Sequence, residues 1–344
     1  MKNKGLLILT SSFCLVLVLT LLMFLPACTS GPTADKPITL RYTSGSSLKD
    51  PKVIIVDGYF KPEIEKRTGG KVIIEFHPGA ELYKHSEAPD GVISNAVQIG
   101  YTSLAERWSD FNPVLEYGQT YFLLQSADTF LRDMQPWRDL LYPIYEEQGV
   151  KVLHFLSNGM GGIISRKPIN GPDDLQGLII RGPTASDFLA LEALGATPTR
   201  VATAEMFDAL SKGSIDGIRT SVTAMAANKL HEAGAGYLLF PVDLSIWVVF
   251  MNLDEWNSLP KDLQDTIMEV AQDTENKSFS EIGQAQAEAM ELLNAVTQVY
   301  TPSPADVVEF QKRLQPVIDA TLAKSIEKGY GEEAQRFLDL ARKG

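Results

Sequence analysis

Cysteine is nearly absent from this chain, and the scarcity limits its chemistry. Only Cys14 and Cys28 occur among 344 residues, and Cys14 lies inside an apolar N-terminal run. If that run is removed, Cys28 is the single remaining thiol and no internal disulfide can form. The folded part then offers no other thiol for catalysis or metal binding.

Motifs for enzymatic chemistry are also missing. The four histidines have neither the HExxH spacing nor another spacing typical of metal ligands, and no GxSxG nucleophile elbow occurs. The glycine-rich stretch Gly159–Gly162 lacks the lysine of a P-loop and the later glycine of a dinucleotide fingerprint. A turn or hinge is its better interpretation. The sequence therefore predicts no metal, no other cofactor and no enzymatic activity.

An excess of positive charge is lacking as well. The chain has 31 Lys and Arg against 43 Asp and Glu, a net charge of −12. Residues 1–27 carry two lysines and no acid, so without them the net charge is 29 − 43 = −14. Such an acidic surface argues against a nucleic-acid partner. The remaining length, about 300 residues, allows one large domain or two medium ones.

Only one long hydrophobic run is present, and it lies at the N-terminus. Two lysines precede an apolar run from Gly5 to Pro26, as in a secretory signal. The run ends in Leu25-Pro26-Ala27-Cys28, a sequence that a lipoprotein signal peptidase accepts. We expect a signal peptide over residues 1–27, a lipid on Cys28 and a flexible tether over residues 28–37. An uncleaved membrane anchor is the alternative, and either places the folded part outside the cytoplasm.

A block of strand, helix, strand, helix and strand signals occurs twice, over residues 38–104 and 178–222. Its strands are expected at Ile38–Ser44, Lys71–Pro78, Ile99–Leu104, Leu178–Thr184, Thr197–Thr203 and Ile215–Val222. Its helices are expected near Val53–Arg67, Pro89–Val97, Ser186–Gly195 and Ala204–Gly213. Two similar α/β units predict two lobes that face a cleft, where small ligands bind.

Segments outside the block predict how the lobes connect. Val150–Phe155, Tyr237–Pro241 and Ser245–Asn252 have strand composition. Residues 260–296 are strongly helical, with Ser258 as a plausible cap. They form either one helix that spans both lobes or two helices with a break near residues 278–283. Residues 305–340 again have helical spacing.

Residues that end equivalent strands should line the cleft, because ligands bind beyond the carboxyl ends of strands in α/β sheets. These residues are Thr43, Ser44, Thr102 and Ser103 in the first copy, and Arg181, Arg219 and Thr220 in the second. They supply hydroxyls and guanidinium groups but no acid, which suits an anion.

Arg181 is the strongest candidate of this set. It ends an apolar strand and precedes a Gly-Pro pair, so its charge should be partly desolvated and costly without a partner. A ligand carboxylate would supply that partner in a bidentate pair. A structural salt bridge to an acid of the same lobe is the alternative.

The segment Pro172–Gly217 contains Asp-Leu-x-Gly-x-x-x-Arg, Gly-Ala-x-Pro and Glu-x-x-x-Ala-Leu-x-x-Gly-x-x-Asp-Gly. With His77–Val92 and Asn252–Ile267, it resembles the substrate-binding proteins of tripartite ATP-independent periplasmic (TRAP) transporters, a group that includes dicarboxylate-binding proteins. The resemblance covers nearly all of the chain after the signal. It implies that Arg181 holds the carboxylate of an organic acid, which is passed to membrane permease subunits.

The same resemblance implies an α/β fold, a two-lobed clamshell like the class II periplasmic binding proteins, with a long helix spanning the lobes. We expect lobe I to contain residues 38–160 and about 246–290. Lobe II would contain residues 161–245 and about 291–344.

Departures from the family pattern bear on the substrate. Sialic-acid-type members carry a second arginine where this chain has Gly161, and nearby Arg166 either compensates or lies at the surface. The Gln-Glu-Asn of those members is replaced by Ile218-Arg219-Thr220, so Thr220 offers a hydroxyl and Arg219 points either inward or to solvent.

Two further candidates are Glu87 and Trp247. Glu87 matches an acidic position that lines some pockets, with a solvated helix start as the alternative. Trp247 either stacks on a ligand or belongs to the core. Two other functions stay open on the sequence alone: a receptor of an ATP-driven importer, and an extracytoplasmic sensor or enzyme on the same scaffold.

Overall fold

The computed structural model describes residues 36–48, 50–124, 130–131 and 133–342. The predicted signal peptide, the predicted lipid site Cys28 and most of the predicted tether lie outside these residues. No helix in the described ranges is long and apolar enough to cross a membrane. Residues from Ile38 onward form one unit, to which the following description applies.

The two copies of the repeated block have the same strand arrangement. The first copy contains β1 (Ile38–Thr43), α2 (Pro51–Ile55), η2 (Val56–Phe60), α3 (Lys61–Arg67), β2 (Val72–His77), α4 (Ala88–Ile93) and β3 (Ile99–Ser103). The second contains β5 (Ile179–Arg181), α8 (Ala185–Ala193), β6 (Thr197–Thr199), η5 (Thr203–Glu205), α9 (Met206–Ser211) and β7 (Gly217–Ser221). β1 pairs in parallel with β2 and β3, and β5 pairs in parallel with β6 and β7. The predicted repeat is therefore confirmed, with ends that differ by a few residues.

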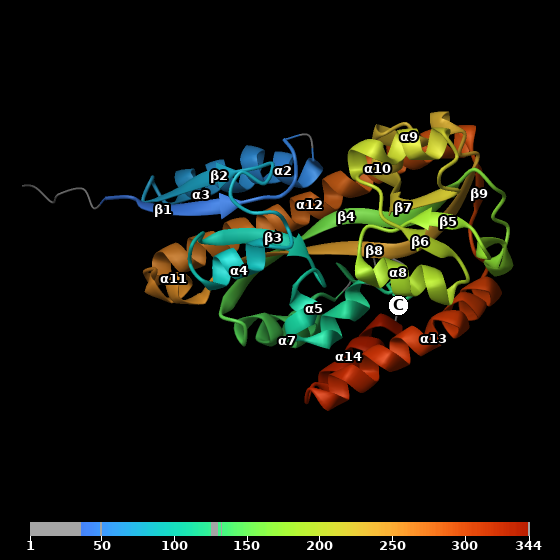
Figure 1. The fold of residues 1–344 in the computed structure, drawn as a ribbon. Helices are drawn as coiled ribbons and strands as arrows, with labels where there is room; N and C mark the ends of the chain where they lie inside the picture. Colours follow the sequence, from blue (N-terminus) through green and yellow to red (C-terminus); the bar gives the residue numbers. More distant parts are fainter. Residues whose placement is uncertain (1–35, 49, 125–129, 132, 343–344) are drawn as a thin grey trace, which may run out of the picture. The chain divides into compact units, whose positions relative to one another are not determined.

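Two long strands join the copies into one sheet. β4 (Val150–Ser165) and β8 (Tyr237–Asn252) pair antiparallel at its centre, in the order β2-β1-β3-β8-β4-β7-β5-β6, and β9 (Gln298–Tyr300) pairs with β8 (Figure 1). The prediction of two separate strands over residues 237–252 was wrong, because β8 is continuous. Of the turn or hinge predicted at Gly159–Gly162, the turn was also wrong, and the hinge stays a prediction. This stretch lies within β4, where register shifts accommodate Gly159 at a φ of 77°.

The long helix is a single element. α12 runs from Lys261 to Val296 without a break near residues 278–283, and Pro260 rather than Ser258 precedes it. It contacts α2 and α3 in the first copy and, near the second, α10 (Val222–Ala227) (Figure 1). Ser278 is buried in this helix and accepts a hydrogen bond from the backbone N–H of Ser157, at 3.1 Å. Packing against β4 therefore keeps the helix continuous at the place where the sequence allowed either a break or a single helix.

The remaining elements complete the layers around the sheet. They are α5 (Trp108–Phe111), η3 (Pro113–Gln119), α7 (Gln135–Glu146), η4 (Pro172–Leu175), η6 (Leu230–Ala233), α11 (Leu253–Ser258), α13 (Pro304–Glu327) and α14 (Gly331–Arg342). Apolar side chains pack in separate clusters around β1–β3 and around β5–β7. We call these parts the first half and the second half.

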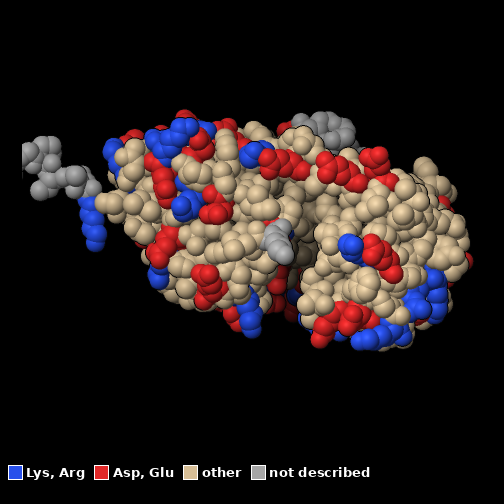
Figure 2. All heavy atoms as spheres, turned by 90° about the horizontal axis from the view of Figure 1, so that it is seen from above, with Lys and Arg blue, Asp and Glu red and all other residues tan. Residues whose placement is uncertain are grey.

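The strand ends of both halves meet at the middle of β4 and β8. Ser103 ends β3 opposite Trp247 of β8. Ser221 ends β7 opposite Gly161 of β4, which in turn lies opposite Asp243 of β8. We call residues 157–161 and 243–247 the junction. The surface is hollowed between the two halves on the face seen in Figure 2.

Candidate ligand-binding site

Arg181 lies at the end of β5 with 8 % of its surface exposed. Its Nε donates to the carbonyl of Val201 at 3.1 Å, and its Nη1 donates to the carbonyl of Arg219 at 3.3 Å. Burial lowers the pKa of Arg181; the negative charge of Asp187 opposes this shift, and the positive charge of Arg219 adds to it. An arginine side chain nevertheless stays protonated in proteins.

The structure bears on the two alternatives for Arg181. Among the described residues, no aspartate or glutamate forms an ion pair with its guanidinium. Both of its observed partners are neutral backbone carbonyls. A desolvated cation without an acidic partner is a favourable place for an anionic ligand group.

Arg219 points inward, and its charge is already balanced. Its Nη2 contacts Asp243, and its Nε lies 3.3 Å from Oδ1 of Asp187. The hydroxyl of Tyr121 donates to the same Asp187 oxygen at 2.7 Å. Burial alone would lower the pKa of Arg219, but the carboxylates of Asp243 and Asp187 outweigh it and hold that pKa above its ordinary value. A ligand contact by Arg219 stays a prediction, and any ligand would compete with these acids.

The place of the missing second arginine is already filled. A Cβ atom at Gly161 would overlap Oδ1 of Asp243 and would lie 3.3 Å from Nη2 of Arg219. Arg219 therefore brings a guanidinium from β7 to the position beside Gly161. Sequence alignment alone cannot show this replacement, because the two positions lie on neighbouring strands.

The hydroxyls of the first copy differ in their availability. Thr102 accepts a hydrogen bond from the indole of Trp108 at 2.9 Å and donates to the backbone of Ser103, so it faces the core. Ser44 shares a hydrogen bond of 2.6 Å with the hydroxyl of Tyr101. Thr43 is fully buried, and its hydroxyl has no partner in the described part of the chain. Ser103, in contrast, is hydrogen-bonded to two residues that line a cavity.

That cavity lies between the two halves and has a volume of about 270 Å³. Ser103 accepts hydrogen bonds from Gln119 at 2.7 Å and from the backbone of Glu106 at 3.3 Å. Glu106 and Gln119 line one side, and Pro183, Thr184 and Arg200 line the other. Arg181 itself does not line the cavity. Pro183 and Thr184, which follow it directly after Gly182, do, so the cavity borders the end of β5. Burial raises the pKa of Glu106.

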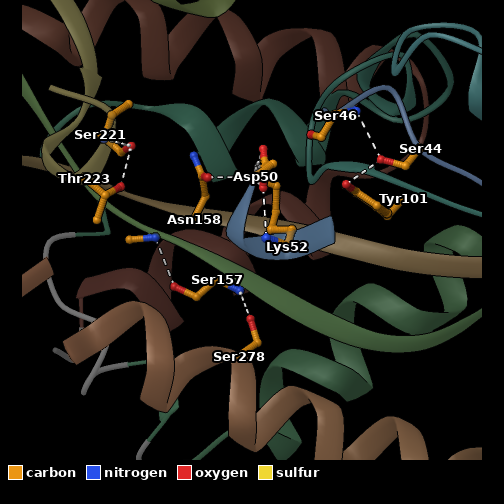
Figure 3. Close-up of polar contacts among 12 residues, drawn as sticks. Ser44, Ser46, Asp50, Lys52, Tyr101, Ser157, Asn158, Ser221, Thr223 and Ser278 are labelled. Atoms are coloured by element: carbon orange, nitrogen blue, oxygen red, sulfur yellow. Dashed lines mark hydrogen bonds and ion pairs between the residues drawn. The ribbon is translucent and has the colours of Figure 1, made fainter. Parts of the chain in front are cut away.

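On the second half, Thr220 is half-buried in β7 and lies opposite Gly162 of β4. Ser221 caps α10 and shares a hydrogen bond of 3.0 Å with Thr223. Figure 3 shows this pair across from Asn158 of β4. The hydroxyl predicted at Thr220 is thus accompanied by two others at the same strand end.

Sequence analysis missed a buried lysine at the junction. Lys52 is 3 % exposed, and its ammonium group lies 3.0 Å from Asp50 and 2.7 Å from the side-chain oxygen of Asn158 (Figure 3). It also lies 4.6 Å from the ring centre of Trp247. Burial lowers the pKa of Lys52, against the opposing carboxylate of Asp50.

A signal for Lys52 was present in the sequence. Asp50-Pro51 is typical of a helix start, and it places Lys52 in the first turn of α2, where a cation is unfavourable. A lysine at such a position needs a specific partner. The helix predicted from Val53 began one residue too late to reveal it.

Trp247 belongs to an aromatic group rather than to an isolated stacking surface. Its ring lies 4.8 Å from that of His85 and 5.7 Å from that of Tyr101. Its indole N–H is buried without a hydrogen-bond partner in the described residues. His85 is held by Ser46 at 3.1 Å, and burial lowers the pKa of His85 to about 4. The imidazole is therefore neutral near physiological pH.

Glu87 and Arg166 lie in exposed positions. Glu87 is exposed at the start of α4 and accepts a hydrogen bond from the backbone of Lys84 at 3.2 Å. Arg166 donates to the carbonyl of Leu210 at 2.7 Å, at the end of α9. These contacts match the solvated and surface alternatives. A ligand contact by either residue stays a prediction.

Acidic, histidine and cysteine side chains were also considered as metal ligands. Within the described ranges, no group of three or more of them is arranged to hold a metal ion.

A sheet of two similar α/β halves, crossed by β4 and β8 and spanned by α12, defines the class of two-lobed solute-binding proteins. The family model of DctP, described as bacterial extracellular solute-binding protein, family 7, matches residues 44–325. The chain belongs to this family. The resemblance to TRAP substrate-binding proteins is thereby confirmed.

Curated relatives are distant in sequence. The chain is 27% identical over 241 residues to the C4-dicarboxylate-binding periplasmic protein DctP of Rhodobacter capsulatus, covering 68% of this chain and 71% of the relative. It is 26% identical over 216 residues to a solute-binding protein of Roseobacter denitrificans, covering 62% of this chain and 66% of the relative. The match thus spans slightly less than two thirds of the Roseobacter protein.

Solved structures are similar over most of their length. A Bordetella pertussis extracytoplasmic solute receptor binding pyroglutamic acid has a TM-score of 0.77 at 22% identity, covering 88% of this chain and 99% of its own. A TRAP periplasmic solute-binding protein from Ochrobactrum anthropi has a TM-score of 0.80 at 18% identity, covering 90% of this chain and 96% of its own. At these identities the likeness establishes the fold. The predicted two-lobed α/β fold with a long spanning helix is confirmed.

Proposed function

We propose that this protein is an extracytoplasmic receptor that captures an organic acid and delivers it to the permease subunits of a TRAP transporter. The observation that carries the proposal is Arg181, a buried cation beside the cleft with no acidic partner among the described residues. Family membership supports it. Similar structures hold pyroglutamic acid, β-D-galacturonate and succinate, each of which carries a carboxylate.

The hinge of this receptor is proposed at the junction. The pairing of β4 with β8 shifts register between Ser157 and Met160, opposite residues 244–246 of β8. This shift supports the division into lobe I, residues 38–160 and about 246–290, and lobe II, residues 161–245 and about 291–344. Arg181 would grip the carboxylate from lobe II. Hydroxyls of Ser103 and Thr220 would reach the ligand from the two lobes as they close.

The protein is further proposed to act without chemistry on its ligand. The family is one of solute-binding proteins, and the sequence contains no motif of a nucleophile or a metal-dependent enzyme. A bound acid should therefore be recovered unchanged. Nuclear magnetic resonance spectra of the acid after prolonged incubation would reveal any turnover.

A screen of organic acids tests the proposed function directly. The purified protein should show a raised melting temperature with at least one monocarboxylate, dicarboxylate or sugar acid, because a ligand that binds only the folded state stabilises it. Native mass spectrometry of the freshly purified protein would identify any acid that it carries. Neutral sugars and amines at equal concentration serve as controls. A panel in which no acid binds would contradict the proposal.

Anchoring by a lipid on Cys28 is also proposed, on the basis of the Leu25-Pro26-Ala27-Cys28 sequence. Mass spectrometry of the mature protein should find a diacylglyceryl group on an N-terminal Cys28. The Cys28→Ser variant should lose that group, because serine has no thiol to carry it. An unmodified Cys28 in the membrane-associated wild type would exclude a lipoprotein.

A further inference from the structure

The junction and the second half contain three buried cations and three acids that face them. Lys52 is paired with Asp50. Arg219 is paired with both Asp187 and Asp243. Among the described residues Arg181 forms no ion pair, whereas Arg219 forms two, and the formal charges of the six groups sum to zero. The site is therefore neutral before any ligand enters, although one cation within it is free to bind an anion.

A first carboxylate on the ligand has a clear partner in this arrangement. It can form an ion pair with Arg181, whose two observed hydrogen bonds go to the neutral carbonyls of Val201 and Arg219. The charge-assisted pair compensates the desolvation of both groups.

Neither of the other two buried cations at the junction is open to a second carboxylate. The ammonium group of Lys52 already contacts Asp50, Asn158 and the face of Trp247. The guanidinium of Arg219 is held between two acids, and Asp243 occupies the space beside Gly161 where a further side chain would stand. One oxygen of Asp243 is buried without a hydrogen-bond partner in the described structure. A second anionic group would have to displace these acids from their cations or face them.

Outside these ion pairs, the polar groups described at the junction are uncharged. The indole N–H of Trp247 is buried and has no hydrogen-bond partner among the described residues. The Ser221–Thr223 pair lies on the side of Asn158 away from Lys52 (Figure 3). The bordering cavity is lined by two acids, Glu106 and Asp110, and by two cations, Arg107 and Arg200, so its charges balance. The uncharged groups at the junction suit hydroxyl, amide or carbonyl functions, and neither set adds net positive charge.

We infer that the site selects an organic acid with a single carboxylate and uncharged polar groups elsewhere, and that Asp243 is a specificity residue that disfavours a second carboxylate. The inference rests on the proposed function and sharpens it. The selection is by charge, because Asp243 neutralises the guanidinium of Arg219, which could otherwise bind a second carboxylate.

Matched ligand pairs test the inference on the wild-type protein. Calorimetry near neutral pH would compare succinamate with succinate, glutaramate with glutarate, and D-glucuronate with D-glucarate. Within any pair that binds, the monocarboxylate should bind at least about tenfold more tightly, because the dicarboxylate brings a second charge without a partner. If the panel identifies another acid, that acid is paired with its analogue of changed charge. Equal or tighter binding of the dicarboxylate member would overturn the inference and leave the proposed function intact. Binding of no acid at all would overturn both.

The Asp243→Asn variant tests the role of the residue itself. Removing this charge leaves Arg219 with only Asp187, so the ratio of monocarboxylate to dicarboxylate affinity should fall about threefold or more. Asp57→Asn, at an exposed acid of η2, is the control and should leave the ratio unchanged. Circular dichroism melts establish that both variants are folded. An unchanged ratio in folded Asp243→Asn would overturn the assignment of Asp243. If that variant does not fold, Asp243→Glu, which keeps the charge, should retain the wild-type ratio, and a lost preference there would overturn it.

Discussion

Arg181→Ala should weaken binding of the organic acid by at least about tenfold while the protein stays folded. A hydrogen bond to a charged group contributes about 1.5–3 kcal/mol, and each 1.4 kcal/mol is about tenfold in affinity. A bidentate pair between guanidinium and carboxylate involves two such bonds. The loss should therefore be plain in calorimetry with the acid that the panel identifies.

The stability of the Arg181→Ala variant should change little. Arg181 makes two hydrogen bonds to backbone carbonyls, which the variant loses. It also carries a buried charge without an acidic partner in the described residues, and removal of that charge relieves a desolvation cost. These two effects oppose each other, so the free energy of unfolding should shift by about 1–2 kcal/mol at most.

Two comparisons separate binding geometry from charge. Arg181→Lys keeps the positive charge but lacks the planar fork, so its affinity should fall between those of the wild type and Arg181→Ala. Arg336→Ala removes an exposed arginine of α14 and should bind like the wild type. Wild-type affinity in folded Arg181→Ala would show that the carboxylate is held elsewhere.

The fold could be predicted from the sequence because local patterns specified it. β2 and β5 are short, largely apolar runs, and the strands of each copy pair in parallel. The main errors lie at β4 and β8. Gly159 is a turn signal in isolation, but pairing with β8 carries the strand through it by a shift of register. Such pairing is a long-range contact, which the local pattern does not contain.

The site was predictable only in part, for a similar reason. The end of β5 identified Arg181, because an arginine after an apolar strand is unusual in itself. The availability of a side chain depends on its partners, and those come from distant positions. Thr102 is held by Trp108, whereas the charge of Arg219 is balanced by acids of α8 and β8. Lys52 was missed because its partner Asn158 lies 106 residues away.

The largest loss of stability is expected for Arg219→Met. This change removes the cation between Asp187 and Asp243, which are each 2 % exposed. Asp187 keeps hydrogen bonds from Tyr121 and from Thr184. Asp243 loses its one observed partner and becomes a buried charge without compensation. Breaking a buried ion pair in this way costs about 3–5 kcal/mol, so urea unfolding should show a loss of that size.

The loss should depend on pH in a direction that identifies Asp243. Burial raises the pKa of Asp243 even in the wild type, where Arg219 opposes the shift. Without Arg219 the folded variant should hold this proton still more tightly, whereas the unfolded chain releases it near about pH 4. A group with a raised pKa in the folded state stabilises it below the unfolded pKa, and that contribution is lost as pH rises through the folded pKa. The deficit relative to the wild type should therefore be smallest near about pH 4 and largest near about pH 8.

Two further variants separate lost charge from lost packing at Arg219. The double variant Arg219→Met/Asp243→Asn removes the uncompensated charge and should regain at least about half of the lost stability at neutral pH. Arg313→Met is the control for an exposed pair. It breaks ion pairs with Asp173 and Glu309, whose side chains are 92% and 41% exposed, so it should lower the free energy of unfolding by no more than about 1 kcal/mol. A deficit for Arg219→Met that does not vary with pH, and that Asp243→Asn does not relieve, would mean that Arg219 stabilises the second half by packing and not by its charge.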